Sequence, residues 1–281
     1  MRIFLLAFLL LISVFLLSTC KKHVPAKEAF LIKASDVKVR TKSGQGSGSH
    51  KITDLWLYVN GQYRGAYPVG NAMPIVSEGD NVTIDILAGI KNNGISDTRI
   101  PWSFYTALHF DTLVGTGKTI ERAFTFEYKA STTFTWNENF ESSLSLTRSS
   151  NSAKGVAQAA TADCFEGKSG LLQLDGSDYY LQVESTFDFA LPISSPDVYL
   201  ELNYKCNTQF EIGLIGSSTE LKSAMVLNPQ ESWNKIYIQL ATAVSTPPTS
   251  TSYKIYFKMQ KSDTDSETKK VFLDNIKLVY F

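Results

Sequence analysis

Apolar residues recur at every second position in one short segment after another along this chain of 281 residues. Because successive side chains of a β-strand point to opposite faces, a period of two predicts a strand with one buried face. Val82, Ile84 and Ile86 follow this period, and Phe124 and Phe126 follow it again further on. We find no amphipathic helical pattern longer than two turns. An all-β protein built from many short strands is therefore expected.

The first half of the chain carries the clearest hairpin signal. Lys51–Asn60 is predicted as a strand, Asn60-Gly61 supplies the two-residue turn favoured between antiparallel strands, and Gln62–Tyr67 makes the return strand. About seven short strands separated by turns predict a small β-sandwich over residues 30–136. The segment Leu55–Gly65 also resembles small prealbumin-like or PEGA-type modules, which implies the same kind of fold.

The second half returns to the same period after a break. Residues 145–162 are rich in Ser, Ala and Gly and lack periodicity, which indicates a long loop or linker. We expect a second all-β domain over residues 137–281 that buries its own core. Its predicted inward-facing residues are Val198, Leu200, Leu202, Tyr204, Phe210, Ile212, Leu214, Ile236, Ile238, Leu240, Tyr253, Ile255, Phe257 and Met259.

Four segments of this second domain resemble a known fold. They are Asn139-Phe140-Glu141, Phe165–Gly170, Trp233–Ile238 and Phe272–Ile276. Together they are similar to the galactose-binding-like jelly roll used by many carbohydrate-binding modules, which implies a jelly-roll β-sandwich. The whole chain also resembles uncharacterised two-domain lipoproteins of the Bacteroidota, most distinctively over Gly89–Arg99.

The first residues of the chain have the features of an export signal. Arg2 supplies a positive charge, and Ile3–Leu17 is a run of fifteen residues that are all apolar except Ser13. Such a run is too short to span a bilayer comfortably and is typical of the apolar region of a signal peptide. An ordinary secretory signal is one interpretation of this segment.

The other interpretation is a lipoprotein signal. Leu17-Ser18-Thr19-Cys20 resembles the lipobox of bacterial lipoproteins, which implies a signal peptide over residues 1–19 and acyl chains such as palmitate on Cys20. Residues 20–29 would then form a lipidated tether to the membrane. Lys21 stands where inner-membrane lipoproteins often have Asp, and no acidic cluster follows it. By this resemblance the protein is anchored in the outer membrane and faces the periplasm rather than the cell surface.

The charge of the chain bears on its possible binding partners, and its cysteine content bears on a possible disulfide. The chain has 27 Lys and Arg against 27 Asp and Glu, so it has no electrostatic attraction for nucleic acid. With Cys20 assigned to lipid, Cys164 and Cys206 remain. An oxidising compartment permits a disulfide between them, and two buried free thiols are the alternative.

Glu141 and Asp274 are the candidate metal ligands. Jelly rolls that resemble this one often bind a structural calcium ion through an early Glu and a late Asp, and carboxylate oxygens suit a hard cation. The alternative is that both are ordinary carboxylates at strand ends. The sequence predicts no other cofactor.

Three tyrosines of the second domain alternate against its predicted buried face: Tyr199, Tyr237 and Tyr256. If they share one open surface, they form a face on which sugar rings could stack. If they are scattered or covered by the other domain, the jelly roll is expected to serve as a scaffold. The aromatic loop from Trp102 to Tyr105 is expected to pack in a core or between the domains.

The sequence contains no recognisable catalytic machinery. Nothing pairs His50 with His109 at a useful spacing, and the carboxylates of Asp263–Glu267 lie in a predicted polar hairpin. We therefore predict a non-enzymatic outer-membrane lipoprotein that is a binding or structural component of a cell-envelope assembly, with envelope proteins as partners. The alternative is a lipoprotein that binds a glycan, either peptidoglycan or polysaccharide. An enzyme with an unrecognised site comes third.

Overall fold

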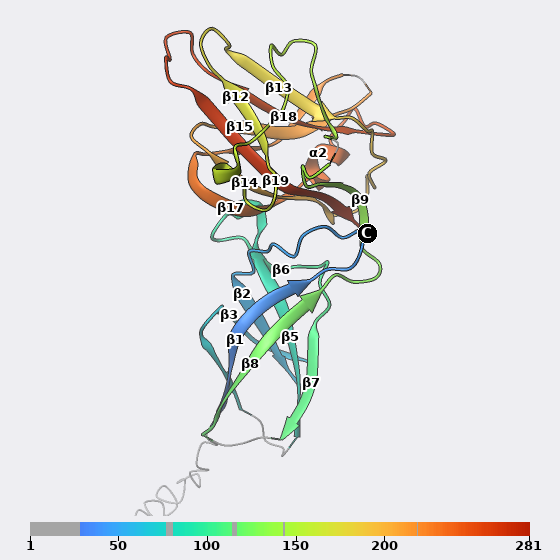
Figure 1. The fold of residues 1–281 in the computed structure, drawn as a ribbon. Coiled ribbons are helices and arrows are strands. Elements are labelled where there is room, and N and C mark those ends of the chain that lie inside the picture. Colours follow the sequence, from blue (N-terminus) through green and yellow to red (C-terminus); the bar gives the residue numbers. More distant parts are fainter. Residues whose placement is uncertain (1–28, 77–80, 114–116, 143, 218) are drawn as a thin grey trace, which may run out of the picture.

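Two β-sandwiches stacked end to end make up the protein (Figure 1). The computed structural model describes residues 29–281 except 77–80, 114–116, 143 and 218. Nearly all of the regular structure is strand, which confirms the predicted all-β fold class. None of the described helices is long and apolar enough to cross a membrane.

The first sandwich has eight strands and one short turn of 3-10 helix. They are β1 (Phe30–Arg40), β2 (Asp54–Val59), β3 (Gln62–Pro68), β4 (Ala72–Ile75), β5 (Asn81–Lys91), η1 (Asn92–Gly94), β6 (Arg99–Pro101), β7 (Leu108–Leu113) and β8 (Thr119–Glu127).

The second sandwich follows with the remaining elements. They are β9 (Thr133–Glu138), β10 (Leu146–Arg148), β11 (Ala157–Gln158), η2 (Thr161–Asp163), β12 (Gly170–Leu174), β13 (Tyr180–Ser185), β14 (Val198–Cys206), β15 (Phe210–Ile215), β16 (Leu221–Leu227), β17 (Gln230–Gln239), α2 (Ala241–Ser245), β18 (Lys254–Gln260) and β19 (Lys269–Tyr280).

The first sandwich is formed by a sheet in the order β3-β2-β5, with β6 and β7 also paired to β5, and by a sheet in the order β4-β1-β8. Strands β1 and β8 run parallel, with Leu31 opposite Thr119, and both begin at the end of the molecule farthest from the second sandwich (Figure 1). Asn60 and Gly61 make the predicted hairpin turn with φ of 51° and 73°. Positive φ at both positions is the requirement of a type I′ turn, which Asn-Gly adopts readily.

The core of the first sandwich forms from the residues that the period of two selects. Leu55, Leu57, Ile84 and Phe126 are fully buried and belong to one apolar cluster between the two sheets. Full burial of each such side chain contributes about 1.5–3 kcal/mol to folding.

The second sandwich has a five-stranded sheet in the order β10-β13-β18-β15-β16 and a six-stranded sheet in the order β11-β12-β19-β14-β17, with β9 also paired to β19. The described strand pairs of both sheets are antiparallel. All the residues predicted to face inward lie in one core between these sheets. The predicted jelly-roll type of sandwich is therefore confirmed for this half of the chain.

The boundary between the sandwiches lies earlier than predicted. Strand β9 pairs with β19 from Thr133 opposite Tyr280 to Glu138 opposite Ile276, and Trp136 of β9 is part of the second core. The second sandwich therefore begins at Thr133, and a boundary before residue 137 would cut this strand. The sequence does not reveal this boundary, because the apolar residues of β8 and β9 follow the same period of two in the same register.

Candidate functional site

The first sandwich covers the outer face of the six-stranded sheet. Tyr199 of β14 and Tyr237 of β17 are each 2% exposed, and their ring centroids lie 4.8 and 4.7 Å from that of Trp102. The Tyr237 hydroxyl accepts a hydrogen bond of 2.9 Å from the backbone N–H of Lys51. The aromatic loop from Trp102 to Tyr105 therefore packs between the two domains, as expected.

The third tyrosine lies on the opposite sheet. Tyr256 of β18 is fully buried, donates a hydrogen bond to the Glu211 carboxylate, and covers Gly213, where a Cβ would come within 2.7 Å of its ring. Of the two outcomes left open by the sequence, the structure therefore shows the second: Tyr199, Tyr237 and Tyr256 are scattered or covered and form no open aromatic face, as expected where the jelly roll serves as a scaffold at these surfaces. The period of two shows that the three side chains point away from the core, but it does not show which sheet carries them or what covers that sheet.

Charged side chains are buried in the same contact between the domains. Glu201 of β14 and Lys235 of β17 form an ion pair of 3.1 Å, with side chains 0% and 2% exposed. Glu201 also accepts a 2.8 Å hydrogen bond from the Tyr128 hydroxyl of the first sandwich. Lys277 of β19 donates to the backbone oxygen of Ser47 at 2.5 Å, and burial lowers the pKa of Lys277 to about 8. The hydrogen bonds from Tyr128 to Glu201 and from Lys277 to Ser47 cross between the sandwiches and fix how they meet.

Two pockets of about 440 Å³ each lie at the open edge of the second sandwich, where strands β16 and β17 end the two sheets, and together they are called the groove. Met225–Gln230 and Asn234–Tyr237 line the first pocket, and Glu220–Ala224 and Gln239 line the second. Asn93 of the first sandwich lines both pockets. Each volume is within the usual range of ligand sites.

The turn η1 docks the first sandwich against this groove. Asn93 has φ of 54°, and its carboxamide oxygen accepts a hydrogen bond of 2.8 Å from the backbone N–H of Gln239. Gly94 has φ of 71°, and a Cβ there would come within 3.2 Å of the Ile236 side chain. Glycine therefore allows both the left-handed backbone and the close approach. The turn lies within Gly89–Arg99, the stretch that is most distinctive in the sequence.

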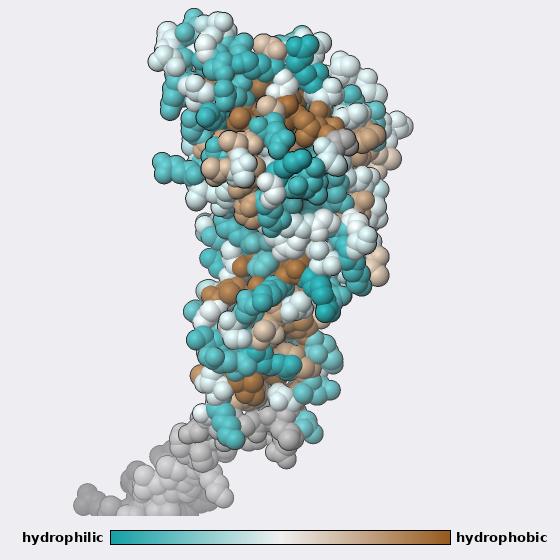
Figure 2. Space-filling model, in the orientation of Figure 1, coloured by the Kyte–Doolittle hydropathy of each residue, from teal (hydrophilic) through white to brown (hydrophobic). Residues whose placement is uncertain are grey.

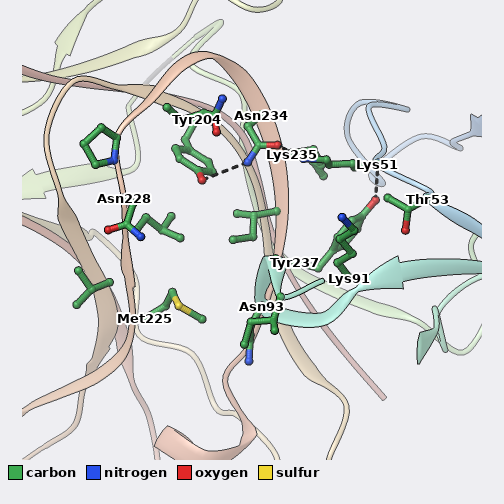
Figure 3. Close-up of a pocket in the computed structure, with 17 residues that line it drawn as sticks. Lys51, Thr53, Lys91, Asn93, Tyr204, Met225, Asn228, Asn234, Lys235 and Tyr237 are labelled. Carbon is green, nitrogen blue, oxygen red and sulfur yellow. Dashed lines mark hydrogen bonds between the residues drawn. The ribbon is translucent and has the colours of Figure 1, made fainter. Parts of the chain in front are cut away.

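Side chains of both sandwiches line the first pocket (Figure 3). Lys51, Thr53 and Lys91 lie on one side, and Asn228 and Met225 lie on the other. Among the described residues that line it there is no carboxylate, histidine or cysteine. Carboxamides both donate and accept hydrogen bonds, which suits a ligand rich in hydroxyl groups. The polar lining residues are Lys51, Thr53, Lys91, Asn93, Tyr204, Asn228, Gln230, Asn234, Lys235 and Tyr237.

The predicted calcium ligands contact the same loop of the jelly roll. Asp274 accepts hydrogen bonds from the Ser169 hydroxyl at 2.7 Å and from the Glu166 N–H at 3.2 Å, and Glu141 accepts one from the Lys168 N–H at 2.6 Å. Burial raises the pKa of Asp274 to about 6. Within the described part of the chain, no group of three or more His, Cys, Asp or Glu could hold a metal ion. The carboxylates of Asp274 and Glu141 thus accept hydrogen bonds from N–H and O–H groups of this loop. Calcium binding stays a prediction.

The cysteines do not form the candidate disulfide. Cys164 and Cys206 are both free thiols. Cys206 is buried, its sulfur lies 3.5 Å from the backbone oxygen of Asn228, and burial raises the pKa of its thiol. The alternative of two free thiols is the one that the structure shows, although Cys164 is only partly buried. The predicted lipidation site, Cys20, lies outside the described residues.

Sequence reasoning missed the groove. Its residues come from segments that are far apart along the chain, near positions 51, 91 and 225–237, and none of these segments carries a motif. The signals that were present are the carboxamides flanking Pro229 and the polar Asn234 within a predicted strand. Only the docking of η1 on β17 brings these side chains to one place.

Comparison with known proteins finds solved carbohydrate-binding modules that are similar to part of this chain. No protein-family model matches the chain, and no curated protein matches it. A family 29 carbohydrate-binding module complexed with mannohexaose is 12% identical, with 53% of this chain and 92% of that chain covered and a TM-score of 0.36. The family 11 module of a cellulosomal cellulase of Clostridium thermocellum is 16% identical, with 51% and 94% covered and a TM-score of 0.35.

A third similar structure is a family 61 carbohydrate-binding module in complex with β-1,4-galactotriose. It is 10% identical, with 47% of this chain and 85% of that chain covered and a TM-score of 0.32. At these identities the likeness is one of fold alone.

Proposed function

We propose that this chain is a non-catalytic, lipid-anchored protein that binds a glycan in the groove formed by β16, β17 and η1. The groove itself carries the proposal, because its two pockets share Asn93 and the first is lined by the carboxamides of Asn93, Asn228, Gln230 and Asn234. A carboxamide has two N–H donors and two acceptor lone pairs, so each keeps capacity for a sugar hydroxyl beside the bonds that it makes within the protein, such as those of Asn93 to Gln239 and of Asn234 to Tyr204. The resemblance of the sequence to galactose-binding-like jelly rolls indicates the same class of ligand.

The lining of the groove favours binding without turnover. Among the described residues along its two pockets, Glu220 is the only carboxylate, and histidine and cysteine do not occur. Most glycosidases need a pair of carboxylates at a fixed separation, one as acid and one as base or nucleophile. A single exposed carboxylate supplies no such pair.

The anchor is a further part of the proposal. Strand β1 begins at the end of the first sandwich that lies farthest from the jelly roll (Figure 1). A lipid on Cys20 would therefore hold the groove at a distance from an outer-membrane surface, with much of the first sandwich between them. The face seen in Figure 2 is largely hydrophilic over both sandwiches, which suits an aqueous compartment such as the periplasm.

The anchor is tested with Cys20→Ala. We expect this variant to lose detergent-dependent membrane fractionation, because no thiol remains to accept the lipid. If the processed variant still fractionates with membranes, the lipoprotein assignment is wrong.

The glycan proposal is tested on an array of neutral and acidic oligosaccharides together with peptidoglycan. The double variant Asn228→Ala and Gln230→Ala should weaken binding about tenfold or more, because each lost hydrogen bond contributes about 0.5–1.5 kcal/mol. The matched control is Gln62→Ala with Gln158→Ala, which removes two exposed carboxamides far from the groove. If the mature protein binds none of these glycans, the proposal fails and a structural role in an envelope assembly takes its place.

A further inference from the structure

We propose that the first pocket of the groove selects an anionic saccharide, and that Lys51 and Lys91 of the first sandwich bind its carboxylate or sulfate group. The inference rests on the glycan-binding function proposed above. It adds the charge of the ligand and gives the first sandwich a direct part in recognition.

Two buried acidic residues beside the first pocket, Asp54 and Glu201, already have cationic partners. Asp54, which follows Thr53 on the pocket wall, is 1% exposed and forms an ion pair with Arg99. Glu201 is paired with Lys235 in the contact between the domains. Lys235 lines the pocket, but its charge is neutralised by this partner. No carboxylate is among the described residues that line the first pocket, so Lys51 and Lys91 have no acidic partner in its lining.

The two remaining lysines have only neutral partners among the described residues. The Lys51 ammonium donates to the carboxamide oxygen of Asn234, and the Lys91 ammonium donates to the Ser96 hydroxyl at 3.3 Å. Burial and the nearby charge of Lys91 both lower the pKa of Lys51. Since two like charges repel each other, an anion bound between them would be stabilised by both.

The polar network beside Lys51 holds it at the pocket wall. Asn234 donates a hydrogen bond of 3.1 Å to the Tyr204 hydroxyl, which orients its carboxamide oxygen toward the Lys51 ammonium. The backbone of Lys51 is fixed by its hydrogen bond to the Tyr237 hydroxyl. A preorganised cation loses less conformational entropy when it binds an anion.

The geometry divides recognition between the domains (Figure 3). Lys51 and Lys91 lie on the wall made by the first sandwich, and Asn228 lies on the opposite wall. Gln230, the first residue of β17, also lines the pocket from the β16–β17 hairpin. A saccharide in this pocket would present its acidic group to the first wall and its hydroxyl groups to the second. Neither sandwich alone would provide the whole site.

The experiment compares acidic and neutral probes on the full mature chain. Oligogalacturonate and a heparan sulfate oligosaccharide are the acidic probes, and cellohexaose, mannohexaose and galactotriose are the neutral ones. We expect at least one acidic probe to bind about tenfold or more tightly than every neutral one, since a charge-assisted hydrogen bond contributes about 1.5–3 kcal/mol. This preference should weaken as NaCl is raised from 50 to 500 mM, because salt screens exposed charges.

The double variant Lys51→Met and Lys91→Met should lose the preference for the acidic probe and keep its thermal unfolding midpoint within a few degrees. The matched control is Lys33→Met with Lys38→Met, which removes the same charge from strand β1 and should keep the preference.

Equal affinity of the Lys51 and Lys91 variant and the unsubstituted protein for the acidic probe would overturn the inference. So would binding that is confined to the neutral probes, although the proposed glycan-binding function would then stand. Binding to none of the probes would overturn both. Equal losses in the two double variants would show attraction by overall charge instead of a site, and would also overturn the inference.

Discussion

The two outer faces of the second sandwich carry similar side chains in different surroundings. On the six-stranded sheet, Tyr237 lies beside the ion pair of Glu201 and Lys235, and the first sandwich seals all three from water. On the five-stranded sheet, Tyr256 lies beside the ion pair of Glu211 and Lys258, whose atoms are 2.6 Å apart.

The described residues of the first sandwich do not cover this other face, which lies on the opposite sheet. The side chains of Glu211 and Lys258 each remain 20% exposed, so water reaches the pair. The same three residue types, tyrosine, glutamate and lysine, thus form a buried cluster at the domain contact on one sheet. On the other sheet they form a cluster that water partly reaches. The comparison shows that the effect of an ion pair on stability depends on what covers it. Burial strengthens the attraction between the two charges, and it also raises the free-energy cost of removing one of them.

The largest expected effect comes from removing one charge of the buried pair. Glu201→Gln should lower the free energy of unfolding by about 3–5 kcal/mol, because Lys235 would stay buried without a counter-charge. The equivalent change on the other sheet, Glu211→Gln, should cost about 0–1 kcal/mol because its partner is hydrated. Urea denaturation of both variants measures the difference.

A double variant provides the control for this first prediction. Glu201→Gln combined with Lys235→Met should recover most of the lost free energy of unfolding, because no unpaired charge then remains. If the single Glu201 and Glu211 variants are equally mild, the two faces do not differ in hydration and the comparison fails.

The tyrosine hydroxyls give a second contrast. Tyr237→Phe removes the acceptor for the backbone N–H of Lys51 inside the contact and should cost about 1–3 kcal/mol. Tyr256→Phe removes one donor to Glu211, which keeps Lys258, and should cost about 0.5–1.5 kcal/mol. Thermal unfolding of the two variants should rank them in this order, and the reverse order would contradict it.

The third expected effect is a pH dependence of the free energy of unfolding, caused by Lys277 on the covered face of the six-stranded sheet. Burial lowers the pKa of Lys277 in the folded protein to about 8, from 10.5 for the free side chain. Between these values the unfolded chain binds more protons than the folded one, so the free energy of unfolding rises with pH. The gain from pH 8 to 9.5 should be about 1.5 kcal/mol.

Urea denaturation at pH 8.0, 8.5, 9.0 and 9.5 measures this slope. The upper limit stays below the range in which the buried tyrosines, whose pKa values are raised above 10, would destabilise the folded state on ionisation. In the Lys277→Met variant this contribution should disappear. A slope that is the same in both proteins would show that Lys277 is not buried as a charge.

Much of the fold follows from the sequence because local patterns decide it. The period of two in Val198–Tyr204 or Tyr253–Met259 selects the inward face of a strand, since apolar side chains leave water wherever the strand is placed. The Asn60-Gly61 turn is equally local, because positive φ at two adjacent positions depends on those two residues alone. The all-β class was predictable for this reason, whereas the jelly-roll type of the second half was predicted from the resemblance of four of its segments to that fold.

What covers the outward faces was decided only by the tertiary structure. Tyr199 and Tyr256 have the same place in their local patterns, yet one meets Trp102 of another domain and the other lies over Gly213 of its own sheet. The groove has the same origin, because Lys51 and Asn228 meet only after η1 docks on β17. The physical reason is that a polar or aromatic side chain can be buried wherever other residues supply its hydrogen-bond partners or counter-charge. Those residues lie far away in the sequence, so the local pattern around the side chain does not reveal them.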